Sequence, residues 1–120
     1  RHEQGAAYMA LGYAQASGKI GACIVGPGPG LLNAGAALCT AYGSNVPVIC
    51  IAGQIPSNQI GVGLGATHEI IDQSSAMRGV VKWVGRADQP SDTPAVLHEA
   101  FSQMLGSTIE LFNFRSSADT

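Results

Sequence analysis

The sequence predicts one α/β domain in three layers, with a mostly parallel sheet covered by helices on both faces. Residues 20–25 and 47–52 are short apolar runs that each end at a glycine, a pattern typical of strands buried on both faces of a parallel sheet. A glycine-rich turn and a helical segment separate them, which predicts a right-handed βαβ unit. With 120 residues, 46% of them hydrophobic, the chain is long enough for one such domain and too short for two.

The first expected element is a helix from Glu3 to Ser17, which Gly18 ends. The chain opens without Met at what we expect to be the junction of a strand and this helix, so we expect residues 1–120 to be a partial domain, truncated before its first strand. Small residues cover the helix, which allows close packing against its own sheet or against another subunit. They are Gly5, Ala6, Ala10, Gly12 and Ala14.

Between the buried strands, residues 31–42 are expected to form a helix that Gly43 closes. Residues 54–67 are rich in Gly, Pro, Ser and Asn and have no periodicity, which predicts a long loop over the carboxyl ends of the strands. Loops of this length in a compact domain are often functional.

Residues 68–77 are expected to form a short helix, and residues 80–84 a strand near the sheet edge, because Lys82 interrupts its apolar run. Thr93 as N-cap and Pro94 in the first turn predict another helix, which Gly106 ends. Its expected apolar face comprises Leu97, Ala100, Phe101, Met104 and Leu105. Residues 107–120 form an atypical C-terminal segment with one expected strand, at 109–114.

Composition excludes several kinds of partner. The net charge is −2 and the six Lys and Arg residues are scattered, so neither nucleic acid nor an anionic membrane surface is expected to bind. No apolar run reaches the about 18 residues of a membrane helix. Cys23, Cys39 and Cys50 lie in apolar surroundings without a C-x-x-C pair, which indicates packed thiols in a reducing compartment. We therefore expect a cytoplasmic protein.

Glu3 is the first candidate for chemistry. A carboxylate in the first turn of a helix is favoured by the helix dipole even without a function. Residues 5–7, however, are small and apolar, and they leave space in which a flat ring could lie beside the carboxyl. Burial there would raise the pKa of Glu3 and let it share a proton with a ring nitrogen.

The turn Gly28, Pro29 and Gly30 lies between a buried strand and a helix, where free N–H groups commonly bind anions. The third glycine of a dinucleotide motif is absent, no P-loop lysine follows, and Pro27 and Pro29 remove two donors. The turn therefore suits an uncharged ring better than a phosphate. His68 and Asp72 lack the H-E-x-x-H pattern, and we expect no metal ligands in this chain.

Three segments together are similar to a known family. Residues 1–7, the 28–30 turn with Asn33, and residues 47–54 resemble the pyrimidine-binding domain of thiamine-diphosphate enzymes of the acetolactate synthase type. The matches in order and spacing run from Arg1 to about Phe101.

The resemblance implies a cofactor and roles for particular residues. It implies that Glu3 hydrogen-bonds N1′ of the pyrimidine of thiamine diphosphate, which prepares the ring to take the proton from C2 of the thiazolium. The cofactor then acts as an electron sink in the decarboxylation or carboligation of a 2-oxo acid. Gly28, Pro29, Gly30 and Asn33 match positions around the pyrimidine, and Gln54 matches the Gly-Gln turn of the family.

The resemblance also implies partners. The diphosphate and its Mg²⁺ are held in these enzymes by a second domain of the same or a partner subunit, and its Gly-Asp-Gly…Asn motif is absent here. We therefore expect this chain alone to be inactive, and the full-length protein to form a homodimer or tetramer. A non-catalytic α/β domain that serves subunit association is the alternative.

The sequence departs from acetolactate synthases at two points. Pro27 stands where those enzymes usually have Ser, and residues 65–67 stand where they have Phe-Gln-Glu. Residues 68–73 resemble relatives with other substrates, so the 2-oxo acid and the choice between decarboxylase and carboligase stay open.

Overall fold

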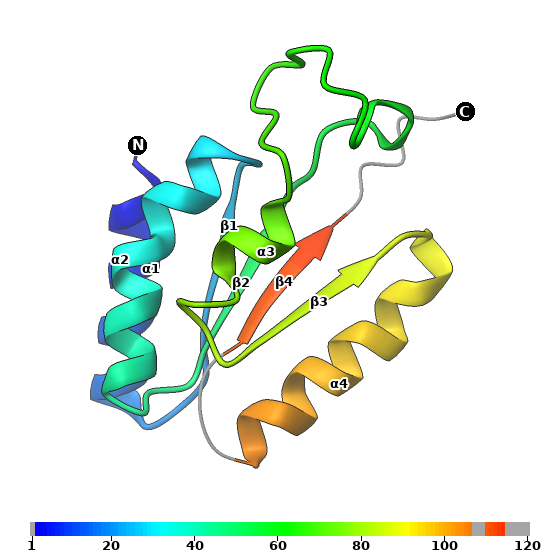
Figure 1. Ribbon diagram of the computed structural model, residues 1–120. Helices are drawn as coiled ribbons and strands as arrows, with labels where there is room; N and C mark the ends of the chain where they lie inside the picture. The colour runs from blue at the N-terminus through cyan, green and yellow to red at the C-terminus, as the bar shows by residue number, and fades with distance from the viewer. Residues whose placement is uncertain (1, 107–109, 115–120) are drawn as a thin grey trace.

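The computed structural model describes residues 2–106 and 110–114, and within them a parallel sheet with helices on both faces (Figure 1). The sheet order is β1-β2-β4-β3, and every neighbouring pair is parallel. The strands are β1 (Gly21–Val25), β2 (Val48–Ala52), β3 (Trp83–Ala87) and β4 (Glu110–Phe114). The helices are α1 (Glu3–Ser17), α2 (Pro29–Gly43), α3 (Gln73–Met77) and α4 (Thr93–Leu105), with 3₁₀ turns η1 (Ser57–Gln59) and η2 (Pro90–Asp92).

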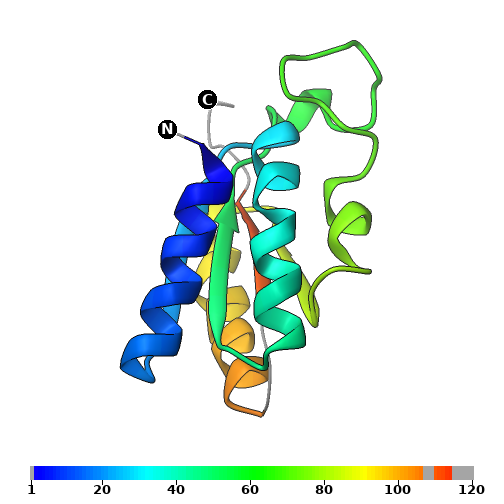
Figure 2. The same ribbon diagram turned by 90° about the vertical axis from the view of Figure 1, so that its left-hand side faces the viewer.

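Strand β2 divides the core in two because successive side chains of a strand point to opposite faces. Val48 and Cys50 belong to the larger apolar cluster, which contains the buried residues of α1 and α2 together with Met77 of α3. Ile49 belongs to a second cluster with Ala100 and Met104 of α4. Helices therefore cover both faces, with α1 alongside α2 at the β1 end of the sheet (Figure 2), which confirms the predicted three-layer α/β class.

Two glycines explain how α1 meets the sheet. Gly18 has φ 67° and its N–H donates to the carbonyl of Ala14, so the predicted glycine stop is confirmed. A Cβ on Gly21 would lie 2.1 Å from the carbonyl oxygen of Ala10. The backbone of α1 therefore packs directly onto the first residue of β1, at a distance that no side chain permits.

The second half of the chain required corrections. The strand predicted at residues 80–84 lies at Trp83–Ala87, although it does occupy a sheet edge. The helix predicted at residues 68–77 is confined to Gln73–Met77, because Asp72 is its N-cap and accepts a hydrogen bond from the Ser75 N–H at 3.0 Å. Thr93 is the first residue of α4 rather than its cap, since η2 runs directly into this helix.

Two predictions of burial were wrong. On α4, Ala100 and Met104 are buried, but Leu105 and Phe101 are 82% and 40% exposed, because only a narrow stripe of this helix touches the sheet. Cys39 is exposed on α2, whereas the other two thiols are buried.

The strand predicted near the C-terminus is confirmed as β4 at Glu110–Phe114. It lies between β2 and β3 rather than at an edge. The remaining residues of the C-terminal segment, 107–109 and 115–120, lie outside the described residues. Among the described helices, none is both long and apolar enough to span a bilayer.

Candidate functional site

The first helices of the chain bring Glu3 and Asn33 together. Glu3 is the first residue of α1, where the His2 side chain accepts a hydrogen bond from the Gln4 N–H and caps the helix. Asn33 is in the first turn of α2, and its Nδ2 donates to Oε2 of Glu3 at 3.1 Å. Two predicted site residues that are 30 positions apart in the chain are therefore in direct contact.

The glycine-proline turn lies against the same carboxyl group. Gly28 precedes α2 with φ 54°, and Pro29 is the first helical residue, as is common because proline needs no hydrogen-bond acceptor there. A Cβ on Gly30 would lie 3.4 Å from Oε1 of Glu3. The start of α2 at Gly30 therefore lies close to the Glu3 carboxyl, and Pro29 and Asn33 are exposed.

The charge state of Glu3 differs from the expectation. The hydrogen bond from Asn33, helped by a backbone N–H, holds the pKa of the Glu3 carboxyl below its usual range. Burial was expected to raise this pKa, but in this chain the carboxyl is only partly covered and desolvation is the weaker effect. Glu3 is therefore ionised at neutral pH.

Gln73 connects the ends of β1 and β2, and sequence reasoning missed it. Its Oε1 accepts from the Gly28 N–H at 2.7 Å, and its Nε2 donates to the carbonyl of Gly53 at 2.8 Å. Gly53 in turn donates to the carbonyl of Val25 at 3.1 Å. The one available sequence signal was the spacing of Gln73 and Met77, which places both on one face of a helix.

The long loop after β2 packs onto the same turn. A Cβ on Gly28 would lie 2.0 Å from the carbonyl oxygen of His68, so the loop backbone covers this glycine directly. Glu69 stabilises the loop, because its carboxylate accepts from the N–H groups of Gly63 at 3.1 Å and Ala66 at 2.8 Å. Glu69 is a second residue whose role was not predicted.

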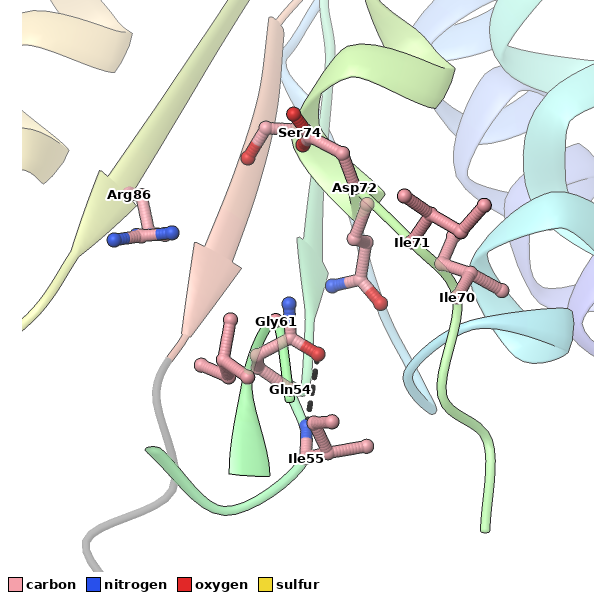
Figure 3. A pocket seen from close by; sticks show the side chains of 10 residues that line it. Gln54, Ile55, Gly61, Ile70, Ile71, Asp72, Ser74 and Arg86 are labelled. Carbon is pink, nitrogen blue, oxygen red and sulfur yellow. Dashed lines mark hydrogen bonds between the residues drawn. The ribbon is translucent and has the colours of Figure 1, made fainter. Parts of the chain in front are cut away.

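Gln54 lies on the wall of a pocket of about 170 Å³, beyond the carboxyl ends of β2 and β3 (Figure 3). Its Oε1 accepts from the Ile55 N–H at 2.9 Å. Asp72, Ser74 and Arg86 also line this pocket, and Arg86 forms an ion pair with Asp88 at 2.7 Å. Glu3, Asn33 and the 28–30 turn do not line this pocket, whereas Gln73, which accepts from the Gly28 N–H, does. Gln54 therefore faces a pocket that the other predicted cofactor residues do not line.

The polar residues of the loop act on its own backbone. His68 has φ 70° and precedes α3, so it does not share a helical face with Asp72. Hydrogen bonds from the Ser75 side chain and backbone hold the pKa of Asp72 below its usual range. Among residues 2–106 and 110–114, no three His, Cys, Asp or Glu side chains lie close enough together to hold a metal ion.

This fold, with a glutamate at the start of one helix against a glycine-proline turn at the start of the next, defines the class of the domain. The chain belongs to the family of thiamine pyrophosphate enzymes, N-terminal TPP binding domain, whose sequence profile matches residues 1–76. The family named from the sequence motifs is thereby confirmed.

Individual relatives give a finer comparison. The chain is 41% identical to an acetolactate synthase of Arthrospira platensis over 101 residues, which cover 84% of this chain and 17% of the relative. It is 38% identical over 102 residues to a probable 2-ketoarginine decarboxylase, AruI, of Pseudomonas aeruginosa, covering 85% of this chain and 18% of that protein. The catalytic subunit of mitochondrial acetolactate synthase from Saccharomyces cerevisiae is 35% identical over 101 residues, 84% of this chain and 14% of the relative. The chain thus spans less than a fifth of the length of these relatives.

Proposed function

We propose that this chain is the pyrimidine-side part of a larger thiamine-diphosphate enzyme that acts on 2-oxo acids. The observation that carries the proposal is the hydrogen bond between Glu3 and Asn33, with the start of α2 close to the same carboxyl at Gly30. Similarity to an acetolactate synthase and to a probable 2-ketoarginine decarboxylase supports this substrate class. Carboligation and decarboxylation are both compatible with it.

The residues around Glu3 fit a flat heterocycle. The Glu3 side chain is only partly covered in this chain, so a ring can approach its carboxyl. Pro29 offers an exposed apolar ring at the start of α2, suited to lie against an aromatic face. The Gly28 N–H is already bonded to Gln73, so this turn presents few donors to a phosphate. The donor set therefore suits the pyrimidine rather than the diphosphate of the cofactor.

In this proposal Glu3 holds a proton or a hydrogen bond at N1′ of the pyrimidine. Asn33 keeps the carboxylate oriented through its hydrogen bond to Oε2, and coverage by the ring removes water and raises the Glu3 pKa toward that of a ring nitrogen. Thiamine diphosphate supplies a nucleophilic carbon for the keto group of the substrate and stores the electron pair that decarboxylation releases.

A second domain must complete the site. Pro29 and Asn33 are exposed and Glu3 is partly exposed, whereas this chemistry requires the exclusion of water. We assign the covering surface, the diphosphate contacts and Mg²⁺ to a diphosphate-binding domain of the same or a partner subunit, in a homodimer or tetramer. The small fraction of the relatives that this chain spans supports this arrangement. A cytoplasmic location stays a prediction, since relatives include chloroplastic and mitochondrial enzymes.

Glu3→Gln in the full-length enzyme tests the proposal. We expect turnover and C2-proton exchange of the bound cofactor to fall by roughly 10²- to 10⁴-fold, the usual scale for loss of a positioned acid or base. Glu99→Gln on the exposed surface of α4 is the matched control and leaves both rates unchanged. Full C2 exchange in the Glu3 variant would refute the proposed role.

One observation favours subunit association as a second function. Met9, Tyr13 and Ile24 border a shallow hollow of about 300 Å³ where α1 meets β1, and all three are large apolar side chains that are more than half exposed. If the Glu3 variant keeps full activity while Ile24→Asp dissociates the assembly, association is the function of this chain.

A further inference from the structure

Gln73 is the buried polar side chain of this domain. It is 2% exposed and is the one polar residue with a buried side chain in the part of the chain that the structure describes. A buried amide is tolerated only when its donor and acceptor both find partners. Here Oε1 and Nε2 both do, with Gly28 and Gly53.

Those two partners are the turns that follow neighbouring strands. Gly28 follows β1 and precedes α2, while Gly53 follows β2. The Gln73 amide therefore joins the carboxyl ends of β1 and β2. The carbonyl of His68 covers Gly28 at the same point, so the turn is held by the first side chain of α3 and by the backbone of the loop before this helix.

The position of this turn sets the surroundings of Glu3. Two residues after Gly28, Gly30 lies against the Glu3 carboxyl, and one turn further on Asn33 donates to it. A shift of Gly28 would move Gly30 and Asn33 relative to the Glu3 carboxylate, because Gly28, Gly30 and Asn33 all belong to the start of α2.

Packing alone does not require an amide at this position. An unbranched apolar side chain such as Met has similar length and would fill the same space, but it leaves the Gly28 N–H and the Gly53 carbonyl without their Gln73 partner, which lowers stability. What Met lacks is a donor and an acceptor that fix the two turns at defined distances.

We infer that Gln73 is a positioning residue for the cofactor site: its amide fixes the Gly28 turn against Gly53 and thereby holds Gly30 and Asn33 in register with Glu3. This inference rests on the proposed function of Glu3. It assigns no contact between Gln73 and the cofactor.

Gln73→Met in the full-length enzyme is the first test, with three readouts. We expect the Kd for thiamine diphosphate, measured with Mg²⁺ by calorimetry, to rise roughly tenfold, the scale of one buried hydrogen bond. C2-proton exchange at saturating cofactor falls, and hydrogen exchange of the 26–31 backbone in the cofactor-free enzyme accelerates. Met104→Ala, in the opposite core, is the control: it lowers thermal stability and leaves all three readouts unchanged.

Gln73→Glu provides a second variant whose behaviour depends on pH. An ionised carboxylate accepts from Gly28 but cannot donate to Gly53, whereas the protonated acid does both, as the amide does. Burial raises the pKa of such a carboxyl. We therefore expect the ratio of its Kd to that of the wild type to fall toward one as the pH is lowered. Taking the ratio at each pH removes the contribution of ionisable groups that both proteins share, such as Asp72.

The outcomes separate this inference from the proposed function. Suppose that Glu3→Gln is inactive but that Gln73→Met keeps its cofactor Kd, its C2-proton exchange rate and its backbone hydrogen exchange within twofold of wild type. This result would overturn the positioning role of Gln73 and leave the proposed function standing. If Gln73→Met does not fold, a Kd ratio for Gln73→Glu that does not change with pH overturns it. Full activity of Glu3→Gln would instead remove the function on which it rests.

Discussion

At the scale of single residues, the proposed chemistry depends on the pair of Glu3 and Asn33. The sequence predicted both residues near a cofactor. The 3.1 Å hydrogen bond between them lowers the pKa of Glu3 and so favours its ionised state. An ionised carboxylate accepts hydrogen bonds and can receive a proton, so it is suited to a ring nitrogen. Asn33 therefore contributes to the site through Glu3.

Asn33→Ala is expected to raise the pKa of Glu3 toward its ordinary value, because the largest lowering contribution is lost. The folded-state pKa of Glu3 is depressed, so its stabilisation is present above the ordinary carboxyl pKa and is lost as the pH falls through the folded-state value. The stability difference between wild type and variant should therefore vanish in acid. Carboxyl ¹³C titration by NMR measures the shift, with exposed Asn58→Ala as control; an unchanged Glu3 titration in the Asn33 variant would contradict it.

At the scale of elements, the contact between α1 and β1 is made by backbone atoms. Gly21 permits the approach to the Ala10 carbonyl, and α1 in turn carries Glu3 at its start. The placement of the carboxylate therefore depends on a glycine of β1 that packs against the middle of the helix. Gly12, in the same helix, is exposed and has no neighbour within 4 Å of a Cβ position.

These two glycines should respond in opposite directions to alanine. Gly21→Ala forces the helix and strand apart and is expected to lower the free energy of unfolding by about 3 kcal/mol, the upper range for overpacking. Gly12→Ala is expected to raise it by about 0.5 to 1 kcal/mol, since alanine costs less entropy in a helix. Urea unfolding measures both, and a neutral Gly21 variant would show that the close contact is absent in solution.

At the scale of the whole molecule, the sheet separates two apolar cores and encloses two of the three thiols. Cys23 and Cys50 are paired across β1 and β2 and belong to the larger core. The hydrogen bond with Cys23 and burial raise the pKa of the Cys50 thiol. The Cys50 thiolate is therefore suppressed where the sheet is intact. The same hydrogen bond lowers the pKa of Cys23, so burial is what shields that thiol, while Cys39 is exposed on α2.

Thiol labelling should therefore report on the integrity of the sheet. In the folded chain at pH 8 we expect Cys39 to react rapidly with a disulfide reagent, and Cys23 and Cys50 to react at the rate at which the sheet opens. All three react rapidly in denaturant. Fast labelling of Cys50 without denaturant would contradict the arrangement, and Cys39→Ser isolates the two slow thiols.

Much of the fold follows from local pattern. Continuous apolar runs ended by glycine correctly predicted the strands β1 and β2. The prediction that both are buried on both faces was wrong for β1, which ends the described sheet and exposes Ala22 and Ile24. The same logic misplaced β3, because Val80 and Val81 are apolar as well, and Val81 is buried in the core ahead of the strand. An apolar residue indicates burial, whether or not it lies in a strand. The start of β3 is set by its hydrogen-bonded pairing with β4, which begins at Trp83.

The sequence by itself determined the fold class, the family and the group of Glu3, the 28–30 turn and Asn33, because each depends on residues close together in the chain or on a family motif. Tertiary structure alone decided that β4 lies between β2 and β3, and that Gln54 faces a separate pocket. It also decided that Gln73 joins Gly28 and Gly53, which are 45 and 20 positions away. The physical reason is that a buried polar side chain is defined by distant hydrogen-bond partners, and no local periodicity records them.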